Sequence, residues 1–106
     1  MANVIDVDPG MVDIWVDDVD DGVGIFRDNA EILHVDYRQS GESHFEISSG
    51  QETGIKGEIY NLTGGPWRAH IVINAAGRRV YEAYPRGWTI PGWNIAWQDT
   101  FVLRPR

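Results

Sequence analysis

The sequence predicts an all-β protein, an antiparallel sandwich of two sheets with about seven to eight strands. Apolar and polar side chains alternate with a period of two over several short segments, as in strands that bury one face. Turn-forming residues separate these segments at nearly regular spacing. No stretch of ten or more residues keeps an apolar stripe of helical spacing free of glycine, proline or β-branched clusters. A small closed barrel is the alternative architecture.

The clearest strand is expected over 12–16, where Val12, Ile14 and Val16 alternate with polar or aromatic side chains. The same alternation recurs over 33–37 and 45–48. Further strands are expected over 54–62, 67–74, 79–84 and 94–103. Turn residues separate the strands at 20–22, 40–41, 49–50, 63–66, 74–77 and 91–92.

The last expected strand contains a carboxylate where alternation predicts apolar surroundings. Strict alternation places its large apolar side chains on one face: Trp93, Ile95, Trp97, Phe101 and Leu103. Asp99 falls on the same face, and an unpaired buried carboxylate costs several kcal/mol. The sequence therefore predicts either a β-bulge near Gln98 or a place for Asp99 at the edge of the sandwich, and we favour the bulge.

The chain has 106 residues, of which 42% are hydrophobic, enough for one packed core and too few for two. A single domain over 1–106 is expected, with 1–10 a candidate flexible arm and 104–106 also weakly held. Because there is no cysteine, stability has to come from packing. No apolar run is long enough for a transmembrane helix, and the acidic amino terminus does not resemble a signal peptide.

The charge of the chain is negative and unevenly distributed. A formal net charge of −7 argues against nucleic acids and anionic membranes as partners, because both require a basic surface. Residues 1–58 hold 14 acidic and 3 basic side chains, whereas 59–106 hold 2 acidic and 6 basic ones. We expect the two halves to neutralise each other within one fold; head-to-tail assembly of copies is the alternative.

Three motifs in the second half carry a family resemblance. They are the strand and turn over 57–64, the hairpin turn over 74–77, and the corner over 90–92 that leads to an aromatic strand ending at Phe101. Together with 12–16 as an opening strand, they resemble bacterial immunoglobulin-like modules of the CARDB and fibronectin-like kind. The resemblance implies an immunoglobulin-like sandwich with a non-catalytic adhesive or spacer role, and similar folds decorate phage capsids and tails. The many tryptophans and the acidic segment after 12–16 depart from the pattern.

The acidic run contains Asp17, Asp18, Asp20 and Asp21, followed by Gly22. Clustered carboxylates before a glycine turn can bind Ca²⁺, which prefers oxygen ligands. The spacing does not match an EF-hand loop, which needs acids or amides at alternate positions and a distal glutamate, because Val19 occupies one of those positions. A solvated acidic turn is therefore favoured, with calcium as the alternative and no other cofactor expected.

The histidines and serines do not suggest catalysis. Alternation places His34, His44 and His70 on the polar faces of three different strands, so a shared metal site is not expected. The segment 40–44 lacks the glycine-flanked turn of a serine nucleophile. We therefore expect a protein that is not an enzyme. A small enzyme or inhibitor with its chemistry in the 85–93 loop is the weakest alternative.

The tryptophans are the most informative residues for function. Trp67 opens an alternating apolar set and is expected in the core, whereas Trp15 shares its face with two aspartates and Trp88 lies in a loop. Solvent-side indoles either contact a partner or are covered by a loop. The candidate binding residues for a protein interface or a glycan are Trp15, Tyr81, Tyr84, Arg86 and Trp88.

These patterns predict a structural or interaction module, an accessory or decoration subunit of a larger assembly such as a phage virion. Its expected partners are other proteins or copies of itself, including a homo-oligomer, and its expected location is a virion or another assembly synthesised in the cytoplasm. The alternative is a carbohydrate-binding module or small lectin that uses exposed aromatic rings.

Overall fold

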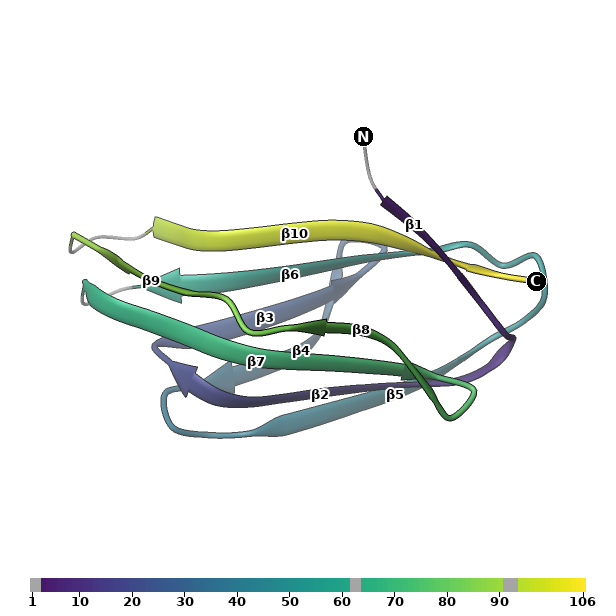
Figure 1. Cartoon of the computed structure of the whole chain (residues 1–106), viewed down its shortest axis with the longest axis horizontal. Coiled ribbons are helices and arrows are strands. Elements are labelled where there is room, and N and C mark those ends of the chain that lie inside the picture. Colours follow the sequence, from purple (N-terminus) through teal and green to yellow (C-terminus); the bar gives the residue numbers. More distant parts are fainter. Residues whose placement is uncertain (1–2, 62–63, 91–93) are drawn as a thin grey trace.

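The computed structural model describes residues 3–61, 64–90 and 94–106, which form ten strands and no helix (Figure 1). In chain order these are β1 (Asn3–Val7), β2 (Gly10–Asp20), β3 (Gly22–Arg27), β4 (Ala30–Asp36), β5 (Gly41–Ile47), β6 (Thr53–Asn61), β7 (Gly65–Ala75), β8 (Arg78–Ala83), β9 (Arg86–Thr89) and β10 (Asn94–Pro105). The all-β prediction is confirmed. The strands outnumber the expected seven or eight because β1, β3 and β9 form in addition to the predicted segments.

The strands build two open sheets that pack around one hydrophobic core. Sheet A has the order β1-β10-β6-β3-β4, and sheet B has the order β5-β2-β7-β8 with β9 also paired to β7. Figure 1 shows the long strands β2, β6, β7 and β10 running along the long axis of the molecule. Each described strand pair is antiparallel except β1 with β10, which is parallel.

The core is made by alternate residues of both sheets, as the period of two predicts. In β2, the side chains of Val12, Ile14 and Val16 are fully buried, and from sheet A, Ile59 and Leu103 are also fully buried. Burying one aliphatic side chain of this size contributes roughly 1.5–3 kcal/mol, so a core of this kind can hold the two sheets together without disulfides.

Within 1–10, the candidate flexible arm, Asn3–Val7 form β1. Its register on β10 runs from Asn3 opposite Phe101 to Val7 opposite Pro105. The Arg104 Nε atom donates to Asp6 Oδ1 at 2.7 Å, so the two ends of the chain also share an ion pair. Arg104 and Pro105 of the 104–106 segment belong to β10 and pair with β1.

The alternation puzzle in β10 has a different solution from the expected one. The register shift lies between Ile95 and Trp97, before the expected bulge near Gln98, and it leaves Ile95 51% exposed. Asp99 stays on the inner side of β10, where the Tyr81 hydroxyl of β8 donates to its Oδ2 atom at 2.7 Å. A hydrogen bond from the opposite sheet therefore satisfies this carboxylate. Trp93 lies outside the described residues.

Candidate functional site

The outer side of sheet B gathers four of the five predicted binding residues. In β2, Trp15 points away from the core and is 42% exposed. Tyr84, between β8 and β9, is 51% exposed, and Trp88 of β9 is 69% exposed, with Arg86 exposed two residues earlier. We call this set, Trp15, Tyr84, Arg86 and Trp88, the aromatic face.

Strand β9 presents the last two of these residues through a close contact with β7. The Ala69 amide donates to the Pro85 carbonyl at 3.1 Å, and Trp88 then lies opposite Pro66 in the ladder. The Trp67 ring packs under Gly87, where a Cβ atom would come within 2.5 Å of the indole. Only glycine fits there, and this close approach turns the neighbouring side chains outward.

The sequence predicts a loop over 84–88, because proline and glycine weaken the strand signal. In the structure, Arg86–Thr89 form β9. The prediction that Trp67 belongs to the core agrees with its packing against the core cluster. The predicted solvent-side positions of the tryptophans on β2 and β9 are confirmed by their exposure.

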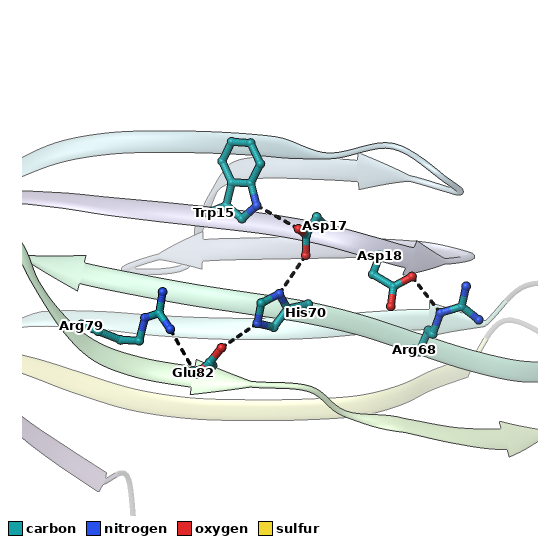
Figure 2. A network of polar contacts seen from close by, with 7 residues as sticks. All are labelled: Trp15, Asp17, Asp18, Arg68, His70, Arg79 and Glu82. Atoms are coloured by element: carbon teal, nitrogen blue, oxygen red, sulfur yellow. Dashed lines mark hydrogen bonds and ion pairs between the residues drawn. The ribbon is translucent and has the colours of Figure 1, made fainter.

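Polar side chains on the same face form a chain of hydrogen bonds across three strands (Figure 2). Trp15 Nε1 donates to Asp17 Oδ2 at 3.2 Å, and the other oxygen of Asp17 lies 2.9 Å from His70 Nδ1. The second ring nitrogen of His70 lies 2.7 Å from Glu82 Oε2, and Arg79 donates to Glu82 at 3.4 Å. The aromatic face is thus bordered by polar groups that already have partners.

His70 is the centre of this arrangement and carries an altered proton affinity. The hydrogen bond to Glu82, followed by that to Asp17, raises the pKa of His70 above its ordinary value, although desolvation opposes the rise. The His70 ring also stacks on the Tyr84 ring, with 5.1 Å between centroids and 25° between planes. Sequence reasoning did not include His70 in the site, because only the cross-strand register reveals that Asp17 lies opposite it.

In the structure, the acidic run forms the end of β2 and the start of the turn into β3. β2 continues to Asp20 with a register shift after Asp17, and Asp18 has a φ of 51° at this irregularity. Arg68 Nε donates to Asp18 at 3.0 Å, and another of its nitrogens lies 3.9 Å from Asp20. Asp21, just after β2, begins the turn into β3 with a φ of 79°.

These contacts concern two predictions, the alternative of a calcium site and the neutralisation of the acidic half by the basic half. Among the described residues, no group of three or more histidine, cysteine or acidic side chains is arranged to hold a metal ion. The carboxylates instead contact Arg68 and His70 of the basic second half, as does Asp6 with Arg104. For these residues, the ion pairs agree with the expected neutralisation of the two halves within one fold.

The remaining predicted residue, Tyr81, does not join the aromatic face. Its ring lies on the inner side of β8, stacked on Phe101 with 4.4 Å between centroids, and its hydroxyl bonds Asp99. Burial raises the pKa of Tyr81 well above its ordinary value, so the phenol keeps its proton and acts as the donor. The alternation of 79–84 could not reveal this, because β7 and β8 change register between Ile73 and Asn74.

The other two histidines also lie between carboxylates, His44 on the outer side of sheet B and His34 on sheet A. His44 of β5 contacts Asp13 and Glu42, and the hydrogen bond to Asp13 is the main cause that raises the pKa of His44. His34 of β4 lies 3.0 Å from Asp36. The predicted placement of the histidines on polar faces is confirmed.

Comparisons of the chain with protein-family models, curated proteins and solved structures give no significant match. Within the described ranges, no helix has the length and apolar character needed to cross a membrane. The function of the protein is therefore inferred from the geometry of the aromatic face.

Proposed function

We propose that this chain is a non-catalytic structural or interaction module that docks a protein partner through the aromatic face. The observation that carries the proposal is the exposure of Trp15, Tyr84 and Trp88 on one side of one sheet, with Arg86 beside them. Tryptophan, tyrosine and arginine are the residue types that dominate binding energy in protein interfaces. Burying one such ring in a partner would contribute roughly 2 kcal/mol.

The surroundings of these rings favour binding without large rearrangement. Tyr84 is held by its stacking on His70, and the Trp15 indole nitrogen is bonded to Asp17. Side chains that are already ordered lose little conformational entropy when a partner arrives. The aromatic face is therefore suited to rapid docking of a preformed surface.

The finer form of the proposal is an immunoglobulin-like accessory or decoration subunit of a larger assembly such as a phage virion. The resemblance of 57–64 and 74–77 to bacterial immunoglobulin-like modules supports it, and so does the two-sheet architecture. The partner would be another structural protein or further copies of this chain.

Site-specific cross-linking tests the proposal. A photoreactive phenylalanine analogue at Trp88 should give one discrete protein adduct in extracts of the native source, and the same analogue at Gln98, exposed on sheet A, should not. Excess unlabelled chain should compete the adduct away, whereas excess Tyr84→Ala/Trp88→Ala chain should not. Equal labelling from both positions would contradict docking through this face, and light scattering would distinguish self-association from a different partner.

A carbohydrate partner is the second candidate, favoured by one feature of the same face. Tyr84 presents an exposed ring next to the carboxylates of Asp17 and Glu82, which can accept hydrogen bonds from sugar hydroxyls. A glycan array separates the two candidates. Saturable binding of one glycan class, with a shift of tryptophan fluorescence that Tyr84→Ala abolishes, would favour carbohydrate over protein.

A further inference from the structure

We propose a second binding site, an oxyanion site at the end of the sandwich where β1 crosses to β2. An open hollow of about 220 Å³ lies there. Three guanidinium groups line it, from Arg78 and Arg79 at the start of β8 and from Arg106 at the end of the described chain. The floor is apolar and comes from Val7, Ala75 and Val80.

Two of these guanidinium groups make no hydrogen bond within the described chain, although the charge of Arg106 helps to lower the pKa of the nearby Asp6 carboxyl. Among the described residues, neither Arg78 nor Arg106 makes a side-chain hydrogen bond or ion pair, whereas Arg79 reaches Glu82 at a long 3.4 Å. Elsewhere Arg68 and Arg104 each bond a carboxylate. The hollow therefore gathers positive charge whose hydrogen-bond donors remain available to a ligand.

The number of donors indicates the charge and shape of the ligand. One arginine can satisfy both oxygens of a carboxylate in a bidentate pair, so three arginines exceed what a carboxylate uses. A phosphate monoester carries a charge near −2 and three acceptor oxygens, which match several guanidinium groups at once. The geometry points to a dianionic phosphate ester, either a free small molecule or a phosphorylated side chain of a protein.

Two aspartates in the lining limit the affinity. Asp6 is bonded to Arg104, so its charge is largely compensated. Asp8 is exposed and makes no hydrogen bond or ion pair within the described part of the chain, so its charge opposes an anion. Because the hollow is open to water, we expect binding in the millimolar range that weakens with salt.

Backbone amide shifts measured by NMR at pH 7.5 test this site with inorganic phosphate as the probe. Saturable shifts should cluster at 75–80 and 104–106, and sodium chloride of equal ionic strength should not reproduce them. Arg78→Ala should weaken binding by about fivefold or more, and Asp8→Asn should strengthen it by about twofold. Arg38→Ala, at an exposed arginine between β4 and β5, is the matched control and should leave binding unchanged.

The result that overturns the site is shifts that do not saturate, or equal losses for Arg78→Ala and Arg38→Ala. Acetate that binds as tightly as phosphate would contradict the preference for a dianion. Glycerol phosphate and a phosphoserine peptide then identify the source: tighter binding of the peptide indicates a phosphorylated protein, and equal binding indicates a small phosphate ester. Failure here leaves the aromatic face untouched, because the two sites share no residue.

Discussion

Aromatic side chains lie on the outer faces of both sheets, but those on sheet A contact neighbouring polar side chains whereas those on sheet B are exposed. On sheet A, Lys56 Nζ lies 4.6 Å above the Phe26 ring, and the Tyr60 hydroxyl donates to Glu58 at 2.8 Å. Burial and this hydrogen bond raise the pKa of Tyr60 to about 12. On sheet B, the rings of the aromatic face remain between 42% and 69% exposed. Rings on sheet A therefore stabilise the fold, whereas those on sheet B are available to a partner.

A glycine explains how sheet A covers its polar groups. A Cβ atom at Gly24 would come within 3.0 Å of both the Tyr60 hydroxyl and a Glu31 carboxylate oxygen, so these groups close over the gap that the missing side chain leaves. Glu58 lies beside Gly24 in the ladder and is only 6% exposed. Exposure of the two faces thus depends on which positions lack a side chain as well as on which carry rings.

The largest expected loss of stability comes from removing the buried carboxylate on the outer side of sheet A. Glu58→Ala removes the carboxylate that Lys56 Nζ contacts at 3.2 Å and that Tyr60 bonds, so it should cost about 2–3 kcal/mol of unfolding free energy. Urea denaturation measures this loss. Glu46→Ala, at an exposed position of β5, is the control and should change stability by less than about 0.5 kcal/mol. Equal effects would show that the two faces do not differ in this way.

A smaller loss is expected between the sheets. Tyr81→Phe keeps the ring stacked on Phe101 but removes the donor to Asp99, and it should cost about 1–2 kcal/mol. In an Asp99→Asn background, the same change should cost less, because the neutral amide tolerates the loss of a donor better than a carboxylate. Thermal or urea unfolding of the four proteins gives the coupling energy, and strictly additive losses would contradict the bond.

The sequence predicted the parts of this fold that depend on alternation alone. Val12, Ile14 and Val16 are buried, and Trp15 between them is exposed, because side chains of a strand point to opposite sides in turn. Strand β3 was missed because Gly22 and Gly24 occupy its outward positions, and glycine weakens the strand signal. The buried side chains of Val23 and Ile25 carry the strand signal, but no polar neighbours alternate with them.

The candidate site was predictable only in part, for a related reason. Trp88 could be recognised as a solvent-side indole, but its neighbours on the aromatic face come from other strands. That Asp17 faces His70 depends on how β2 and β7 pair, and the inward turn of Tyr81 to Asp99 depends on a register shift between β7 and β8. A shift of one residue exchanges the two faces of a strand, and no local pattern in this chain marks where those shifts fall.

The pH dependence of stability should report on the polar network of sheet B. On sheet B, the raised pKa of His70 means that its contribution is complete below about 6.5, the ordinary value, and is lost as pH rises through the raised value. The lowered pKa of Glu82 means that its contribution is present above about 4.5 and is lost as pH falls through the lowered value. The pair should therefore stabilise the protein most between these values.

Melting temperatures across pH 4–9 measure this effect in the native chain and in His70→Gln. The native chain should lose stability above neutral pH more steeply than the variant, and the difference should be small because solvent screens the partly exposed pair. His44→Gln provides a comparison on β5, where the raised pKa of His44 gives a change of the same sign. An NMR titration of His70 with a midpoint below its ordinary value would contradict the arrangement.

The smallest effect on stability is expected at the most exposed ring. Trp88→Ala should change the free energy of unfolding by less than about 0.5 kcal/mol, because the side chain is 69% exposed in the free chain. Gly87→Ala, one residue earlier, should cost more, because its Cβ would collide with the Trp67 ring and displace β9. Both variants should weaken partner binding at least tenfold, the first by removing the ring and the second by moving it. A Trp88→Ala chain that unfolds more easily than Gly87→Ala would mean that the ring is part of the fold, and the contrast between an open sheet B and a covered sheet A would fail.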